Sequence, residues 1–352
     1  MFVLINVIDV GLGLLFIYYV YYVYYVFKLI YENSTKKKIF IAGHNGMVGS
    51  SILRYFKKLG LKNIILRSRK KLDLTNWNKV NQFLKKTKPD IVINCAGKVG
   101  GILANSTYLK EFLLENIYIQ LNLIDACFKN KIKTLVNLGS ACIYPRKAKQ
   151  PIKESYLMSG KLEPTNEAYA IAKIVGLKSC EFYNKQFKTN YFTLMPCNLY
   201  GPNDNFNAKS SHFIPGLINK FYLANLKNIN NVEIWGSGKP KREIMHVDDL
   251  ASAIYFILIK IEKNDKKVLN ILKKNSHINI GSGKEYNIRQ YAQMISKLFS
   301  KRTNLKFNKK YPDGMPRKLL NSSLINRMGW KPIISIEKGL RETLEWYKEN
   351  VK

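Results

Sequence analysis

Acidic residues are scarce in this chain. Its 352 residues include 24 Asp and Glu against 58 Lys and Arg, which gives a formal net charge of +34. A strongly basic protein suits an acidic partner such as nucleic acid or a membrane surface. The cations are spread along the chain, however, and the runs 36–38 and 70–71 are too short to form a nucleic-acid-binding arm. We therefore expect solvated lysine-rich faces and no nucleic-acid partner.

Cysteines are few, and their spacing is irregular. No CxxC pair occurs, which argues against a disulfide framework and against a structural zinc site. We expect no metal centre and a reducing compartment such as the cytoplasm. The five cysteines are Cys95, Cys127, Cys142, Cys180 and Cys197.

Charges are almost absent from the first 30 residues, where Asp9 and Lys28 are the only ones. An apolar run of this length can span a bilayer as one helix. It lacks the basic start and the small-residue cleavage site of a signal peptide. Two interpretations of residues 2–30 remain open. One is a membrane anchor. The lysines that follow it would then keep the catalytic domain in the cytoplasm, because positive charges flanking a membrane helix stay on that side. The other is an extension that does not anchor the chain to a membrane.

Beyond an apolar segment and linker at 1–35, strands and helices alternate up to about residue 200. This alternation predicts βαβ units and a doubly wound parallel sheet of Rossmann type over 36–200. From 201 to 352 it breaks down, and we expect a smaller α/β substrate-binding lobe with some chain crossing back to the sheet. The expected strands are 38–42, 63–66, 90–96, 134–138 and 191–196; the expected helices are 47–59, 76–86, 110–129, 166–187, 215–226, 247–261, 288–299 and 336–349.

A glycine-rich loop joins the first expected strand to the first expected helix. The spacing GxxGxxG allows a tight turn, a close approach of the backbone to a pyrophosphate, and close packing of the helix. The helix N-terminus then attracts the phosphates. We expect a dinucleotide to be bound by this loop, which comprises Gly43, His44, Asn45, Gly46, Met47, Val48 and Gly49.

The end of the second strand indicates which dinucleotide is bound. A carboxylate there would bind the ribose 2′-hydroxyl of NAD. Here the segment 66–71 contains cations and no acid, and Arg69 can hold a 2′-phosphate through paired hydrogen bonds. The sequence therefore predicts NADPH/NADP+, with Asp73 and Leu74 near the adenine.

A serine, a tyrosine and a lysine follow at the positions that a reductase needs. Ser140 comes directly after the strand 134–138, and Tyr169 and Lys173 are four residues apart on one helix. We expect Lys173 to hold the ribose and to lower the pKa of Tyr169. Tyr169 can then give a proton to a carbonyl oxygen that Ser140 binds.

These motifs are typical of extended short-chain dehydrogenases/reductases, and longer strings resemble the GDP-L-fucose synthase family. The resemblance covers about residues 38–350. Two departures stand out: Asn45 replaces an Arg that bacterial relatives often carry, and Ala141 replaces a Ser. The strings are FIAGHNGMVGS (40–50), KVGGI (98–102), CIYP (142–145), EPTNEAYAIAK (163–173), MPCNLYGPNDNF (195–206), SSHFIPGL (210–217), WGSGKPKRE (235–243) and PDGMPRKLL (312–320).

The resemblance implies a two-stage reaction on GDP-4-keto-6-deoxy-D-mannose, namely 3,5-epimerisation and then NADPH-dependent reduction at C4. It assigns the extra acid/base pair to Cys142 and His212, and which of them is the base stays open. It also implies a homodimer formed through helices like 110–129 and 166–187. Further cofactor contacts would come from Leu138, Gly139, Lys173, Pro196, Asn198, Leu199 and His212. Substrate contacts would come from Asn198, Lys220, Trp235, Arg242, Asp313 and Lys318.

Two other functions remain open. A nucleotide-sugar 4,6-dehydratase or 4-epimerase shares the glycine loop and the Tyr-Lys pair, although Ala-Cys-Ile-Tyr stands where a dehydratase normally has a Thr-Asp-Glu-like group. A non-catalytic dinucleotide-binding sensor would use the fold without the chemistry. The presence of Ser140, Tyr169 and Lys173 argues against the second.

Overall fold

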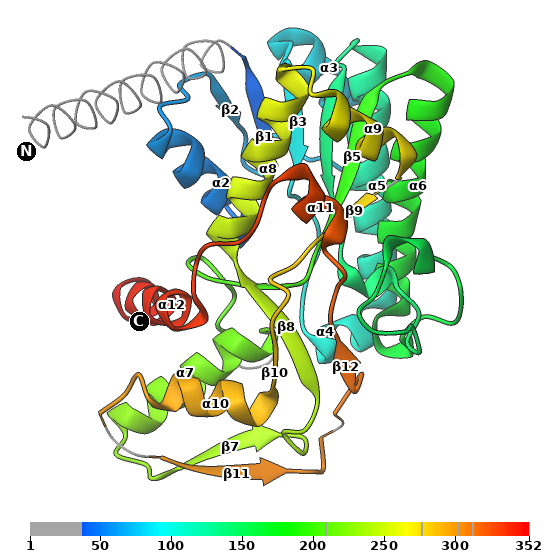
Figure 1. Cartoon of the computed structure of the whole chain (residues 1–352). Helices are drawn as coiled ribbons and strands as arrows, with labels where there is room; N and C mark the ends of the chain where they lie inside the picture. The colour runs from blue at the N-terminus through cyan, green and yellow to red at the C-terminus, as the bar shows by residue number, and fades with distance from the viewer. Residues whose placement is uncertain (1–36, 208–209, 276, 301–302, 312, 352) are drawn as a thin grey trace, which may run out of the picture.

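The larger lobe is built on a six-stranded parallel sheet of order β2-β1-β3-β4-β5-β9. The computed structural model describes residues 37–207, 210–275, 277–300, 303–311 and 313–351. Helices cover both faces of the sheet (Figure 1). The strands are β1 (Ile39–Ala42), β2 (Ile64–Leu66), β3 (Ile91–Asn94), β4 (Thr134–Leu138), β5 (Asn190–Pro196) and β9 (His277–Ile280).

The central strands are apolar along their whole length because both of their faces are buried. Successive side chains of β1 alternate between two cores: Ile39 and Ile41 enter one, and Phe40 and Ala42 enter the other. The first core lies under α2 (Met47–Lys58), α8 (Val247–Glu262), α9 (Lys266–Lys274) and α11 (Ser323–Met328). The second lies under α3 (Trp77–Thr87), α5 (Leu109–Lys129) and α6 (Glu167–Phe187).

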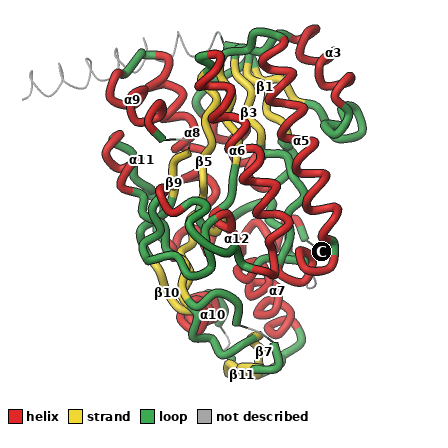
Figure 2. Tube along the Cα trace, turned by 90° about the vertical axis from the view of Figure 1, so that its right-hand side faces the viewer, coloured by secondary structure: helices red, strands yellow, loops and turns green. Residues whose placement is uncertain are grey.

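The smaller lobe has its own core between strands and three helices. Strand β8 (Lys241–His246) pairs with β6 (Asn198–Tyr200), β10 (Glu285–Asn287) and β12 (Arg317–Lys318). A second pair, β7 (Asn231–Trp235) with β11 (Asn304–Asn308), lies at the far end of the molecule (Figure 2). The helices are α7 (Phe213–Leu226), α10 (Ile288–Ser296) and α12 (Ile336–Asn350).

A buried carboxylate joins β8 to two segments that cross between the lobes. The side chain of Glu243 is 1% exposed and accepts hydrogen bonds from the main-chain nitrogens of Gly283, at 2.7 Å, and Leu320, at 2.9 Å. Gly281 has no room for a side chain, because a Cβ there would collide with this carboxylate. Glu243 thereby fixes the chain that follows β9 and the chain that follows β12 against β8.

The predicted α/β fold with a Rossmann-type parallel sheet is confirmed. Some chain beyond residue 200 was expected to cross back to the sheet, but the sequence did not identify which elements do so: they are β9, the last strand, and the helices α8, α9 and α11. The predicted membrane segment, residues 2–30, lies outside the described residues. Within the described ranges, no helix is both long enough and apolar enough to cross a membrane.

Candidate active site

The glycine loop forms a tight turn that opens onto the N-terminus of α2. Gly43 has φ +83°, and a Cβ there would lie 2.7 Å from the nitrogen of Ala96. A Cβ on Gly49 would collide with the main-chain oxygen of Gly43. Gly46 precedes α2 without a side-chain cap, so the first N–H groups of the helix remain available. The Nδ1 atom of His44 is buried and has no hydrogen-bond partner among the described residues. This donor-rich turn fits a dinucleotide pyrophosphate.

Arg69, the predicted 2′-phosphate ligand, already has an ionic partner. Its Nη2 atom lies 3.2 Å from Oε2 of Glu115 on α5, and its side chain is 77% exposed. Glu115 also pairs with Lys98, at 3.2 Å. A phosphate at this edge would therefore compete with Glu115 for Arg69. Asp73 is turned toward its own loop, where hydrogen bonds from Thr75 lower its pKa.

The carboxyl ends of β4 and β5 bring the remaining predicted cofactor contacts together. Leu138 ends β4, Gly139 follows it, and Pro196 ends β5 beside them. Asn198 and Leu199 continue directly into β6, the first strand of the smaller lobe. A ligand bound in a doubly wound fold lies at this edge of the sheet.

Ser140 contacts both Cys142 and Tyr169. Ser140 accepts a hydrogen bond at 3.4 Å from the nitrogen of Cys142 and so begins a short 3-10 helix, η1 (Ala141–Ile143). Its side chain also hydrogen-bonds to the side chains of Cys142 and Tyr169. Tyr169 and Lys173 lie on one face of α6, with the ammonium 5.6 Å from the centre of the phenol ring.

The expectation that Lys173 lowers the pKa of Tyr169 is wrong. Burial raises the pKa of the phenol, Cys142 adds to the rise, and the hydrogen bond from Ser140 offsets part of it. Lys173 is itself buried, and burial lowers its pKa to about 8. Tyr169 is thus held as a proton donor, which is the form that carbonyl reduction requires.

A ladder of buried amides fixes α6 behind Tyr169 and Lys173. Asn94 donates to Asn137 at 2.9 Å, Asn137 donates to Gln120 at 3.2 Å, and Gln120 donates to the main-chain oxygen of Ala172 at 3.0 Å. These amide side chains are at most 1% exposed. Gly176 makes this approach possible, since a Cβ there would collide with Gln120. The ladder sets the position of the α6 turn that carries Lys173.

The ammonium of Lys318, on β12, acts electrostatically on both Cys142 and His212. Burial raises the pKa of the Cys142 thiol, and Lys318 is the largest influence that opposes the rise. Desolvation by the surrounding protein, and then the charge of Lys318, lower the pKa of His212, the N-cap residue of α7, although part of its surface stays exposed to solvent. The free protein therefore holds a thiol and a neutral imidazole that both lie within electrostatic range of the same cation.

The loop that carries His212 is docked on the segment that follows β3. The nitrogen of Gly101 donates to the oxygen of Ser210 at 3.0 Å. A Cβ on Gly101 would lie 2.7 Å from the oxygen of Ser211. Helix α4 (Ile102–Thr107) begins at this contact and packs against η3 (Pro164–Asn166), the turn that leads to α6. The docking holds the chain just before α7, and so His212, against the segment that leads into α4.

Trp235, one of the predicted substrate contacts, already has an aromatic and a cationic neighbour at its ring. Tyr311 stacks on it with ring centres 4.4 Å apart and planes 14° apart. The ammonium of Lys220 lies 4.5 Å from the Trp235 ring centre. We did not find Tyr311 from the sequence; the available signal was an aromatic residue directly before the string PDGMPRKLL.

The other predicted substrate residues differ in whether their side chains are already engaged within the protein. Both carboxylate oxygens of Asp313 accept hydrogen bonds from Ser237, at 2.6 and 2.7 Å, so Asp313 holds the turn after Trp235. Arg242 pairs in register with Lys318 on the neighbouring strand. Burial lowers the pKa of both cations, and Glu163 partly offsets the effect for each. Arg242 and Lys318 thus form a cationic pair at the site.

Three comparisons place this geometry among known proteins. Residues 39–281 match the model of the NAD dependent epimerase/dehydratase family. The GDP-L-fucose synthase of Escherichia coli (strain K12) is 45% identical over 316 residues, 90% of this chain and 98% of that protein.

Two solved structures are also similar to this chain. The GDP-D-glycero-L-gluco-heptose synthase of Campylobacter jejuni, solved in the presence of NADPH, has a TM-score of 0.82 and 37% identity, and the match covers 89% of this chain and 99% of that one. The GDP-L-fucose synthetase of Naegleria fowleri, bound to NADP, has a TM-score of 0.79 and 26% identity, with 90% and 95% covered.

Proposed function

Since the chain belongs to the NAD dependent epimerase/dehydratase family and, within it, to the GDP-L-fucose synthases, we propose that it converts GDP-4-keto-6-deoxy-D-mannose into GDP-L-fucose. It is an NADPH-dependent enzyme that acts as both epimerase and reductase. One observation carries the proposal: Cys142 and Tyr169 both hydrogen-bond to Ser140, and the charge of Lys318 acts on Cys142 and on His212. The reductase group and the extra acid/base pair therefore share one site.

The epimerase stage needs a base to remove the protons at C3 and C5 and an acid to return them on the opposite face. The C4 ketone makes both protons acidic, because the resulting enolate is delocalised onto the C4 oxygen. Cys142 as a thiol has a proton to give, and His212 as a neutral imidazole has a lone pair that accepts one. Lys318 stabilises negative charge on sulfur and disfavours positive charge on the imidazole, so it acts on both partners at once.

The reductase stage needs a proton at the C4 oxygen. Bound NADPH would supply the hydride to C4. Tyr169 donates the proton, Ser140 holds the oxygen through its hydroxyl, and Lys173 holds the ribose. The raised pKa of Tyr169 keeps that proton in place until the oxygen becomes basic. The uncapped start of α2 and the residues at the ends of β4 and β5 would hold the rest of the cofactor.

The GDP end would bind to the smaller lobe. Arg242 and Lys318 would neutralise the pyrophosphate, to which Arg can offer paired hydrogen bonds. Lys220 and Trp235 would hold the base. Asp313 would contribute indirectly, by holding the turn that follows Trp235. Asn198 stands where β5 passes into β6, between the two lobes.

The chain would work as a homodimer through α5 and α6. These helices lie side by side along one edge of the molecule (Figure 2). Large apolar side chains on them are open to solvent, among them Tyr118, Ile171, Phe182 and Phe187. Phe182→Glu should shift the mass in light scattering from dimer to monomer. Whether residues 2–30 anchor the enzyme to a membrane, with the catalytic domain in the cytoplasm, is tested by fractionating the full-length chain with and without them.

Product analysis tests the function directly. With GDP-4-keto-6-deoxy-D-mannose and NADPH, we expect GDP-L-fucose and one NADPH consumed per product, measured by NMR and absorbance. Turnover of GDP-mannose without NADPH would instead identify a dehydratase. Binding of NADPH with no turnover would identify a sensor.

A GDP-heptose synthase is the second candidate, because the Campylobacter jejuni enzyme of that name has a TM-score of 0.82 and 37% identity with this chain. We expect a GDP-4-keto-heptose to give a lower kcat/KM than the 6-deoxy sugar. The reverse order would assign the chain to the heptose enzymes.

A further inference from the structure

A basic hollow lies outside the catalytic cluster, in the segment between η1 and α6. Its volume is about 690 Å³, within the range of about 300–1,000 Å³ typical of small-molecule sites. None of Ser140, Cys142 and Tyr169 lines it. We call it the basic hollow; the residues that line it are Pro145, Arg146, Lys147, Ala148, Lys149, Tyr156, Ser159, Gly160, Lys161, Leu162 and Pro164.

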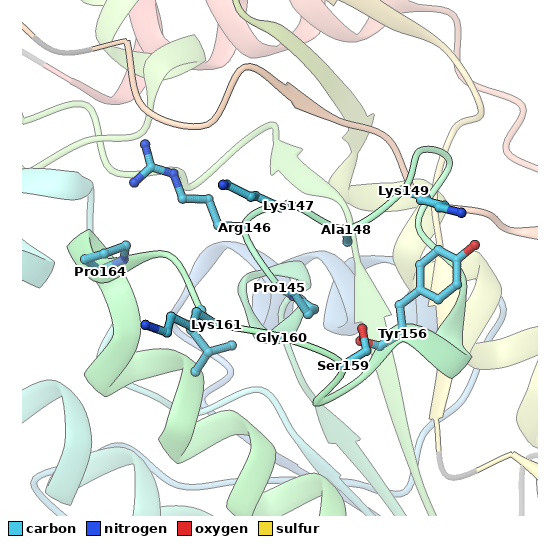
Figure 3. A pocket seen from close by; sticks show the side chains of 11 residues that line it. Pro145, Arg146, Lys147, Ala148, Lys149, Tyr156, Ser159, Gly160, Lys161 and Pro164 are labelled. Carbon is cyan, nitrogen blue, oxygen red and sulfur yellow. The ribbon is translucent and has the colours of Figure 1, made fainter.

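The walls of the basic hollow combine cations with an apolar floor. Figure 3 shows Arg146, Lys147 and Lys161 on one side and Lys149 beside Tyr156 on the other. No carboxylate is among its lining residues. Within the described ranges, no ion pair joins Lys147, Lys149 or Lys161 to an acid. Their charges remain free to bind an anion.

The segment is held in place before any ligand arrives. The nitrogen of Arg146 donates to the oxygen of Lys161 at 2.9 Å and closes the two ends of the hollow. Ile152 exchanges main-chain hydrogen bonds with Leu319 and Asn321, each of 2.8 Å. The side chain of Gln150 accepts from the nitrogen of Leu319 at 2.8 Å. A ligand would therefore meet a preformed site and would not have to order the loop.

Arg146 connects the basic hollow to the catalytic cleft. Its Nε atom lies 3.3 Å from Oε2 of Glu163, while its side chain is half exposed on the side of the hollow. The negative charge of Glu163 also raises the pKa of Arg242 and of Lys318, the two cations proposed to bind the substrate pyrophosphate. One carboxylate thus pairs with a cation of the hollow and lies within electrostatic range of the two cations of the cleft.

We propose that the basic hollow is a second anion-binding site, for a small molecule that carries two or more phosphate groups. The cations would bind the phosphates, and the apolar floor with Tyr156 would accept a nucleoside. An anion that draws Arg146 away would leave Glu163 without its ion-pair partner. The negative charge of Glu163 would then offset more of the positive charge of Arg242 and Lys318, and these two cations would bind the substrate pyrophosphate less tightly. This effect on the substrate rests on the proposed function; the binding itself does not.

Binding is tested with the full-length chain while NADPH and GDP at saturation fill the catalytic subsites. Calorimetric titration with ATP should then find one further site per chain. Lys147→Glu/Lys149→Glu should weaken it at least about tenfold, because it removes two charge-assisted contacts. Lys266→Glu/Lys267→Glu makes the same charge change on exposed residues of α9 and should bind as wild type.

Two results would overturn the site. One is that ATP shows no further binding. The other is that both double variants lose the same amount of ATP affinity, which would mean that only the net charge of the protein attracts ATP. Inorganic triphosphate serves as the second probe. Weaker binding than ATP identifies the ligand as a nucleotide, and equal binding identifies it as an inorganic polyphosphate. Both support the site.

Kinetics test the coupling. With increasing ATP, the KM for the GDP-sugar should rise to a plateau about fivefold above its starting value, with kcat unchanged, because both ligands can bind together. Arg146→Gln should remove the rise and retain ATP binding through the lysines. A KM that rises without limit would mean competition in the cleft and would overturn the coupling. Failure of the proposed function would leave no GDP-sugar turnover to measure, and the calorimetric result would still stand.

Discussion

Lys173 donates a hydrogen bond from Nζ to the main-chain oxygen of Leu138, 2.8 Å away. The bond ties α6 to the last residue of β4, two positions before Ser140. Burial at this junction lowers the pKa of Lys173 to about 8, whereas the pKa of Tyr169 is raised. Of these two catalytic groups, Lys173 is therefore the one whose charge changes near pH 8.

The pH profile of reduction follows from this. Lys173 is charged below about pH 8 and neutral above it, so kcat at saturating NADPH should fall as the pH rises through about 8. Lys173→Arg keeps the charge at high pH and should move the falling limb upward, with a lower plateau. If kcat fell at the same pH in wild type and in Lys173→Arg, a group other than Lys173 would control the fall.

The first half of the fold was predictable because its signals are local. A buried strand, a glycine turn and a helix follow one another within 20 residues around Gly43, and Tyr169 and Lys173 stand one helical turn apart. β9 is four residues long, and nothing near it indicates that it pairs with β5, about 80 residues earlier. The approach of Lys318 to Cys142 depends on β12 joining β8, which is again a long-range pairing. The error about the pKa of Tyr169 arose because burial is the largest influence on it, and burial can be judged only from the packed structure.

The ion pair between Arg69 and Glu115 should control the preference for NADPH. Arg69→Ala should raise the KM for NADPH by about tenfold and leave that for NADH unchanged, because one charge-assisted phosphate contact is lost. Glu115→Gln frees Arg69 and should lower the KM for NADPH. Steady-state kinetics with both cofactors measure the ratio, and an equal effect of Arg69→Ala on both would contradict a 2′-phosphate contact.

Tyr311 should oppose binding of the nucleotide base. Its stack on Trp235 has to open before a base can use that face, and an aromatic pair is worth about 0.5–1.5 kcal/mol. Tyr311→Ala should therefore lower the KM for the GDP-sugar up to about tenfold. Trp235→Ala should raise it. A higher KM in Tyr311→Ala would show that the base stacks on Tyr311 itself.

The amide ladder should be sensitive to the loss of one member. Gln120→Leu leaves Asn137 and the oxygen of Ala172 buried without their partner, at a cost of about 1–3 kcal/mol for each unsatisfied group. Urea unfolding should show this loss, and kcat of reduction should fall as Lys173 shifts. Gln293→Leu, on the exposed side of α10, is the matched control and should change stability by less than about 0.5 kcal/mol. Equal midpoints in the two variants would mean that the ladder does not stabilise α6.

Proton exchange at the sugar ring tests the shared site most directly. In D2O with NADP+ in place of NADPH, wild type should introduce deuterium at C3 and C5 of GDP-4-keto-6-deoxy-D-mannose, as NMR can follow. Tyr169→Phe should keep this exchange while losing reduction with NADPH. Cys142→Ser should slow the exchange by about 10²–10⁴-fold and still reduce the C4 ketone. Exchange at the wild-type rate in Cys142→Ser would contradict a thiol and an imidazole acting on the ring that Tyr169 protonates.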